Sequence, residues 1–295
     1  MSKAASLAEL YKSSVKEYTK TPKEWKGLLS CAARFYKHSF DNAVLIYAQK
    51  PDATQLGTYD EWHDKRIGRS INRGAKGIAV IDMKNPHASI KYLFDFMDTN
   101  GSAASYRNLQ RFMWELEEQY RPAVLRRFQE KYDIAVSGIE ESLYELICRK
   151  AGEILVPYME NLQIEDETSL LYGMPEDAVK AEFAGLVTES AAYTVFSKCG
   201  LTSDHFCDQR FTQISNYNNL QLFIALGNCT MSVARVMLQE IYEEIQAVKS
   251  ERSRSYEDRT PDGFHLQRGE RRNDVSGNQH IGQSTDRPDT GGPVR

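Results

Sequence analysis

The sequence predicts an α+β protein, in which a small N-terminal α+β module is followed by an all-α helical region and a disordered C-terminal tail. Hydrophobic residues recur at helical spacing over most of residues 4–49 and 105–247. Between these stretches, short β-prone runs alternate with turn residues. Residues 251–295 are polar and lack a hydrophobic period, so they cannot bury enough surface to offset their ordering entropy. We therefore divide the chain into an N-terminal arm (1–21), the α+β module (22–101), a helical domain (102–249) and a disordered tail or linker (250–295).

The helices of the first fifty residues carry clear start and stop signals. Residues 4–20 form a weakly amphipathic helix that ends before Pro22, and Pro22 suits the first turn of the next helix. Ser39 or Asp41 can cap a third helix over residues 42–49, which stops before Pro51 because the residue before a proline avoids the α region. Residues 60–64 are predicted to form a single helical turn. The apolar face of the second helix consists of Trp25, Leu28, Leu29, Ala32, Ala33 and Tyr36.

The β-prone runs predict a hairpin and a third strand. Residues 70–72 and 77–81 form the hairpin, with Arg73-Gly74-Ala75-Lys76 as its turn. Residues 90–96 follow as the third strand after a turn at Asn85-Pro86, and Asn100-Gly101 closes the module. From there to residue 247 the chain is predicted to be almost wholly helical, with a break or restart at Pro122 and a glycine stop at Gly200.

The charge of the chain is unevenly distributed. Residues 1–100 carry 16 Lys and Arg against 11 Asp and Glu, whereas residues 101–250 carry 13 against 22, and the tail carries 8 of each. A basic part joined to an acidic part indicates that only the first meets a polyanion. The overall isoelectric point near 5.9 therefore does not reveal the positive charge of residues 1–100.

The cysteines and the lack of an apolar leader predict a cytoplasmic protein. The five cysteines are odd in number and widely spaced, and no two form a CxxC pair, which is typical of reduced, buried thiols. The N-terminus has no apolar signal core, and no apolar run approaches the length of a membrane span. We expect no membrane partner. The thiols are Cys31, Cys148, Cys199, Cys207 and Cys229.

A basic segment between residues 65 and 76 is the main candidate for ligand binding. It contains five cations and no acid, and a phosphate backbone requires such clustered positive charge. Gly68, Gly74 and Gly77 would let the main chain approach the ligand. A solvated hairpin without a ligand is the alternative, since charged runs usually lie on the surface. The predicted phosphate contacts are Lys65, Arg66, Arg69, Arg73 and Lys76.

Aromatic and amide side chains precede this segment. Tyr59 and Trp62 could stack on the bases of a single strand, although an indole is more often a core residue, so Tyr59 is the better candidate. Asn42 and Gln49 flank an apolar run and sit at its two ends. Their amides either brace the loop from Gln49 to Tyr59 or reach a base edge, and we favour bracing.

Signatures of catalysis and metal binding are absent from the sequence. There is no HExxH, no GxxxxGK[ST] phosphate loop and no GxSxG. Cys199, His205 and Cys207 suggest a zinc site at first sight, but they lack a fourth ligand and a regular spacing. Buried thiols and a surface histidine are the favoured interpretation. We therefore expect a protein that is not an enzyme and that has no catalytic residue, metal or cofactor.

Taken together, these residues resemble the N-terminal domain of ArdC-type antirestriction proteins. The resemblance covers about residues 20–100 and preserves order and spacing. It rests on Trp25, on Tyr36-x-x-Ser39-x-x-Asn42, on Leu45-Ile46-x-x-Gln49-x-Pro51-x-Ala53-Thr54, on Tyr59-x-x-Trp62, on Gly68-Arg69, on Gly74-x-Lys76-Gly77-Ile78, and on Phe94-Asp95 with Thr99.

The resemblance implies a single-stranded DNA-binding module of a mobile genetic element, such as a conjugative plasmid or an integrative element. The family role is to protect incoming DNA from host restriction, and full-length relatives continue into a metalloprotease-like domain. Residues 101–250 depart from that pattern, since they contain no HExxH and resemble helical parts of large conjugative-element proteins. The alternative is a non-catalytic interaction module whose acidic helical half recruits a conjugation or restriction protein, or mimics DNA.

Overall fold

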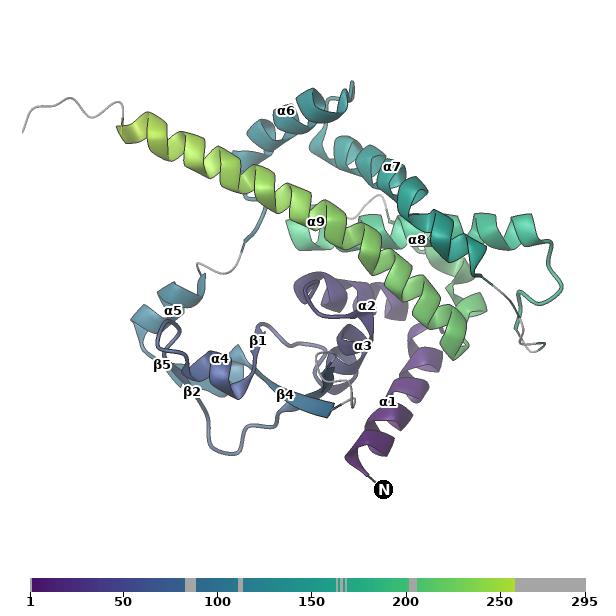
Figure 1. Cartoon of the computed structure of the whole chain (residues 1–295), viewed down its shortest axis with the longest axis horizontal. Coiled ribbons are helices and arrows are strands. Elements are labelled where there is room, and N and C mark those ends of the chain that lie inside the picture. The colour runs from purple at the N-terminus through teal and green to yellow at the C-terminus, as the bar shows by residue number, and fades with distance from the viewer. Residues whose placement is uncertain are drawn as a thin grey trace, which may run out of the picture. The chain divides into compact units, whose positions relative to one another are not determined.

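The structure, a computed structural model, describes residues 2–257 except 83–88, 111–113, 163, 165–166, 168 and 202–205. The described chain is mostly helical and has a small region of short strands (Figure 1), which confirms the α+β class. The predicted disordered tail lies outside the described residues from 258 onward. Its predicted start at residue 250 is too early, because the last helix continues to Glu257.

The first helices begin where the sequence predicts. They are α1 (Lys3–Tyr18), α2 (Pro22–Arg34) and α3 (Phe40–Gln49). The side chains of Ser2, Thr21 and Ser39 accept the N–H groups of Ala5, Glu24 and Asn42, so each helix has an N-cap that satisfies an otherwise unpaired donor. The short helix α4 (Tyr59–His63) starts with a capping box between Thr58 and Glu61.

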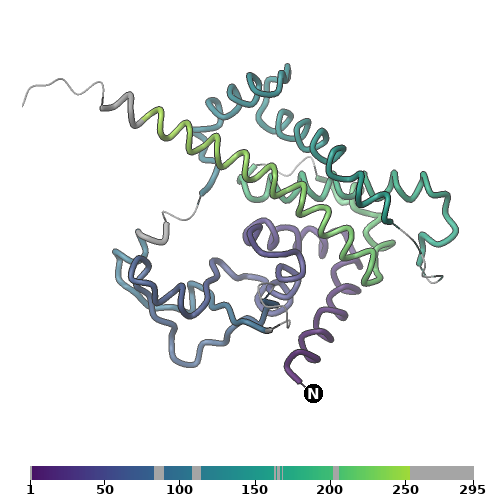
Figure 2. Tube along the Cα trace, in the orientation of Figure 1, coloured from purple at the N-terminus to yellow at the C-terminus, as the bar shows by residue number. Residues whose placement is uncertain are grey.

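The strands form two small antiparallel sheets. One sheet has the order β1 (Leu56–Gly57), β4 (Ser89–Asp95), β3 (Ile78–Asp82), and the other pairs β2 (Arg69–Ile71) with β5 (Thr99–Gly101). The predicted hairpin between residues 70–72 and 77–81 is therefore wrong. Residues 72–77 instead lead from one sheet to the other (Figure 2), with Gly74 at a φ of 85° in the turn. The predicted Asn85-Pro86 turn lies outside the described residues.

The second half of the described chain is helical, as predicted. Gly200, at a φ of 62°, ends α8 (Glu176–Cys199) in the left-handed conformation expected of a glycine stop, and Pro122 lies in the first turn of α6 (Arg121–Tyr132). The 3₁₀ turns are η1 (Phe96–Asp98), η2 (Glu118–Tyr120) and η3 (Asp208–Tyr217). The α-helices are α5 (Ala103–Gln110), α6 (Arg121–Tyr132), α7 (Ile139–Glu160), α8 (Glu176–Cys199) and α9 (Leu220–Glu257).

One large hydrophobic core joins the N-terminal helices to the helical half. The indole of Trp25 on α2 donates to Ser190 Oγ on α8 at 2.9 Å, and its ring packs edge-on against Phe223 of α9. Arg235 of α9 donates to the main-chain oxygens of Tyr36 and His38, just beyond α2. Residues 1–254 form one compact unit, so the boundary predicted near residue 101 falls inside a shared core.

A second, smaller core lies between the three-stranded sheet and the helices α2 and α3. One face of β3 and β4 contributes to it, and α2, α3 and the loop after α3 close it. This core fixes the sheet against the two helices that carry most of the family-like motif. Its buried members are Cys31, Phe35, Ile46, Ala53, Ile78, Val80 and Leu93.

The helix α9 contains a long apolar stretch. Residues Leu220–Arg252 are long and apolar enough to cross a membrane by length and composition, contrary to the expectation that no run approaches that length. However, 56% of its most apolar window is buried inside the structure. Phe223, Met237 and Ile241 are fully enclosed by other helices, which is the usual position of a central core helix.

Candidate nucleic-acid interface

Two of the predicted contact residues brace the sheet instead of facing a ligand. Asn42 Nδ2 donates to the oxygen of Ile81 and Asn42 Oδ1 accepts from its N–H, both at 2.9 Å. Gln49 makes the same pair of bonds to Ala79, at 2.8 and 2.9 Å. Bracing is thus the role of both amides, but the braced element is the edge of β3 and not the loop from Gln49 to Tyr59. Neither amide is free to read a base edge.

Arg69 also has a structural role, which corrects its assignment as a phosphate contact. Its side chain is buried, and Nε donates to Thr99 Oγ1 at 2.8 Å. Its two terminal nitrogens donate to the oxygen of Thr99 and to Ser105 Oγ, at 3.1 and 3.2 Å. The guanidinium lies 4.3 Å from the centre of the Phe96 ring. Two guanidinium nitrogens thus hold β2 against β5 and the third bonds to the helix that follows, and burial lowers the pKa of Arg69.

Trp62 belongs to the core, as expected of an indole. It is 1% exposed and its indole donates to the oxygen of Phe94 at 2.9 Å. A Cβ on Gly57 would lie only 3.0 Å from the indole ring, so the ring lies flat on the main chain of β1. Base stacking on Trp62 is excluded by this packing. The indole instead anchors α4 to the sheet.

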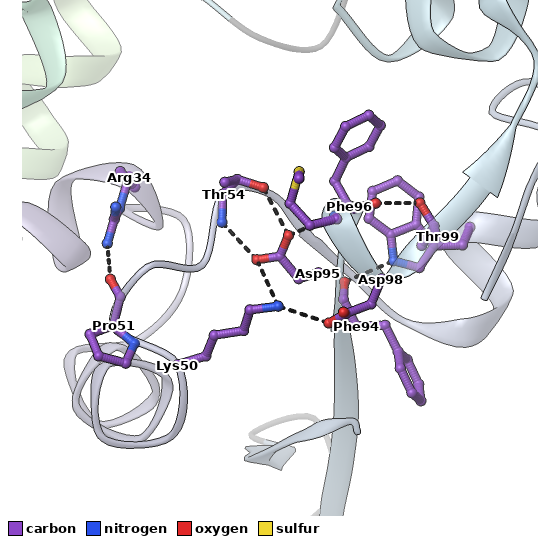
Figure 3. Close-up of polar contacts among 11 residues, drawn as sticks. Arg34, Lys50, Pro51, Thr54, Phe94, Asp95, Phe96, Asp98 and Thr99 are labelled. Carbon is purple, nitrogen blue, oxygen red and sulfur yellow. Dashed lines mark hydrogen bonds and ion pairs between the residues drawn. The ribbon is translucent and has the colours of Figure 1, made fainter. Parts of the chain in front are cut away.

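Other residues of the family-like motif form a polar network around Asp95 (Figure 3). The Asp95 carboxylate is fully buried and accepts from Thr54 N, Thr54 Oγ1 and Met97 N at 2.7–2.8 Å. Lys50 Nζ lies 3.9 Å from the same carboxylate and 2.8 Å from Asp98. These bonds fix the loop that follows α3 to the end of β4. Within this network the Asp95 carboxylate is fully engaged by protein groups.

The cations that remain exposed lie at the two ends of the basic segment. Lys65, Arg73 and Lys76 are exposed, and none of them makes an ion pair with another described residue. Arg66 is also exposed, but both its side chain and its N–H bond to Asp64, which holds the pKa of that carboxyl at about 2. Three free cations and one partly neutralised cation therefore face solvent.

An exposed aromatic pair lies immediately before these cations. The Tyr59 side chain is 57% exposed, and its ring stacks on His63 at a centroid distance of 4.0 Å and an interplanar angle of 21°. His63 Nδ1 also lies 2.9 Å from the oxygen of Tyr59. His63 was not among the predicted contact residues, although its i+4 spacing from Tyr59 on a helix gives the contact. The pair is thus an exposed stack of two rings directly before the cations in the sequence.

The zinc site considered for Cys199, His205 and Cys207 falls partly outside the described residues. Cys199 is buried and Cys207 is exposed, while His205 lies outside the described residues. Within the described ranges, no group of three or more His, Cys, Asp or Glu residues has a metal-binding arrangement. Burial raises the pKa of Cys31 to about 11 and that of Cys199 to about 12, so both thiols stay protonated and inert at neutral pH.

Comparison of the chain with models of protein families, with curated proteins and with solved structures found no match in any of the three.

Proposed function

We propose that this protein binds single-stranded DNA in the cytoplasm as a non-catalytic component of a mobile genetic element. One observation carries the proposal. Lys65, Arg73 and Lys76 are exposed cations without a carboxylate partner among the described residues, and the exposed Tyr59–His63 stack precedes them. Protection of incoming DNA, with or without antirestriction, is the role that the family resemblance adds. The mobile-element setting rests on that resemblance alone.

Physical chemistry favours a single strand over a duplex at such a surface. Exposed aromatic rings bind unpaired bases of any sequence, because every base offers a face for stacking, whereas duplex bases are already stacked. The cations would neutralise phosphates and release their counterions. The two side-chain amides that might have read base edges are occupied by β3, so binding is expected to be insensitive to sequence.

The test is a titration of labelled single-stranded and duplex oligonucleotides by fluorescence anisotropy at several salt concentrations. Changing Lys65, Arg73 and Lys76 together to Ala is expected to weaken single-strand binding at least tenfold and to reduce the salt slope by about 2. The matched control changes Lys16, Lys20 and Arg126 to Ala. These residues are also exposed cations without an ion pair to another described residue, so the net charge falls equally.

The two variants separate a site from a bulk charge effect. Normal affinity in the first variant would refute the proposal, and an equal loss in both would show that net charge alone drives binding. Absence of any binding at low salt would instead favour an interaction module. In the helical half, however, Glu189 is paired with Arg210 at 2.5 Å and Glu244 with Arg127 at 2.5 Å, so part of the acidic charge is already neutralised internally.

A further inference from the structure

The sheet has a second face, which we call the outer sheet face, formed by Gly57, Ala79, Tyr92 and Phe94. Ala79 lies directly opposite Tyr92, and Gly57 lies opposite Phe94, so these four residues share one side of the sheet. The alternate residues, such as Leu93, point into the smaller core on the other side. The outer sheet face is therefore not the face that packs against α2. The same side of the sheet continues into Ile81 and Ile90, which pack with Ala79 against the large core, so Tyr92 marks its solvent-exposed part.

The aromatic rings on this face stand beside the smallest possible neighbours. Tyr92 is 39% exposed, although tyrosine has a large apolar ring, and Phe94 is half-buried. A Cβ on Gly77 would lie 3.0 Å from Tyr92 Cβ and 3.1 Å from Phe94 Cζ. Glycine at residue 77 therefore makes room for both rings. The Tyr92 side chain is partly open to solvent.

Positive charge borders the same face on two sides. Lys3 of α1 has its Nζ 5.6 Å from the centre of the Tyr92 ring. Lys76, exposed and without an ion pair to a described residue, directly precedes the glycine that contacts both rings. On the side of β1 the face is closed by Trp62, which packs on Gly57 and bonds to Phe94. An aromatic surface between cations complements a strand that offers alternating base faces and phosphates.

We propose that the outer sheet face is a base-stacking platform, on which Tyr92 stacks against one base of a bound single strand and Phe94 supports its neighbour. This inference rests on the proposed function and extends it from phosphate contact to base contact. Aromatic side chains on an exposed sheet face bind single-stranded nucleic acid in this way. Gly77, which lies against both rings, directly follows Lys76, so the basic segment and the platform adjoin each other.

The experiment compares Tyr92→Ala with Tyr92→Phe in the full chain. Single-strand affinity is expected to fall about 5- to 150-fold in the alanine variant and to stay within about twofold of the parent in the phenylalanine variant, which keeps the ring. Tyr172→Ala is the matched control, since Tyr172 is 49% exposed in the helical half. An oligonucleotide with abasic sites provides the second measurement, because it keeps the phosphates and removes the bases.

Each outcome separates the platform from the phosphate site. Loss of affinity in Tyr92→Ala that disappears with the abasic oligonucleotide supports stacking. Unchanged affinity in Tyr92→Ala, combined with a weakened Lys65, Arg73 and Lys76 variant, overturns the platform and leaves single-strand binding intact. A lower melting temperature in Tyr92→Ala without loss of affinity in the folded protein also overturns it, because Tyr92 then only covers Gly77.

Discussion

Asn42 and Ile81 exchange two hydrogen bonds of 2.9 Å, one in each direction between a side-chain amide and a main-chain peptide. Ile81 lies on β3, which is an edge strand of its sheet. Gln49, two helical turns further along α3, makes the same exchange with Ala79. An exposed edge strand is a template for pairing with another chain, and here a helix closes it with two amides.

This arrangement predicts that a carboxylate cannot replace the amide of Asn42. Asn42→Asp keeps the size of the side chain and still accepts the Ile81 N–H, but it places an oxygen against the Ile81 carbonyl. We expect the free energy of unfolding in urea to fall by about 2–4 kcal/mol, because a buried acceptor loses its donor and faces a charge. The residue is only 4% exposed, so water cannot replace the lost bond easily.

The control for this prediction is Asn72→Asp. Asn72 is exposed and its side chain has no hydrogen bond to a described residue, so the same chemical change should alter stability by no more than about 0.5 kcal/mol. If Asn42→Asp is as stable as the control, the amide bridge to β3 does not stabilise the fold.

Because the imidazole of His38 is largely buried, we expect the protein to lose stability at mildly acidic pH. Burial lowers the pKa of its imidazole, and Lys91 lowers it further. The folded protein therefore binds the His38 proton less readily than the unfolded chain does. The resulting contribution to stability is present above pH 6.5, the ordinary value, and is lost as the pH falls from there towards the folded pKa.

Urea titrations at pH 7.5 and pH 5.0 measure this contribution. We expect His38→Gln to lose less stability between the two pH values than the parent protein does, by at most about 1.4 kcal/mol per pH unit. Identical curves for the parent and His38→Gln would show that another group causes any acid sensitivity.

The parts of the fold that sequence predicts are the ones that local chemistry determines. The fixed φ of Pro22 favours a helix start there, and the hydroxyl of Ser39 caps the next helix. Gly200 ends α8 because glycine tolerates the left-handed conformation. Each of these signals acts on the backbone of residues close to it in the sequence. The structure places the corresponding helix ends within about two residues of the prediction, which is the usual uncertainty of an end.

Strand partners were not predictable in this way, because pairing depends on residues far apart in sequence. Residues 69–71 pair with 99–101 and not with the neighbouring strand at 78–82. The same limit applies to the candidate site. Arg69 and Arg73 both lie in a cation-rich segment with glycine nearby, and only the distant Thr99 and Ser105 make one of them structural. Asn42 and Gln49 likewise gained their roles from β3, which lies 39 and 30 residues further along the chain.

Arg69 and Arg73 therefore provide the sharpest test of which cations in the basic segment stabilise the fold and which bind phosphate. Arg69→Ala removes the donors to Thr99 and Ser105 and is expected to lower the free energy of unfolding by about 2–3 kcal/mol, since hydrogen bonds from a charged group are strong. Arg73→Ala removes the same charge from an exposed position, so its stability should change by no more than about 0.5 kcal/mol.

Single-strand binding should show the opposite pattern, with a change in Arg73→Ala and none in Arg69→Ala. Below the unfolding transition, Arg69→Ala should keep the salt slope of single-strand binding, because its guanidinium never reaches a phosphate, whereas Arg73→Ala should reduce the slope by about 0.7. Arg69→Lys sharpens the distinction, since lysine keeps the charge but cannot reproduce the planar donor geometry, and its stability should resemble that of Arg69→Ala. A reduced salt slope in Arg69→Ala with full stability would mean that Arg69 binds phosphate and that its contacts with Thr99 do not hold β2 in place.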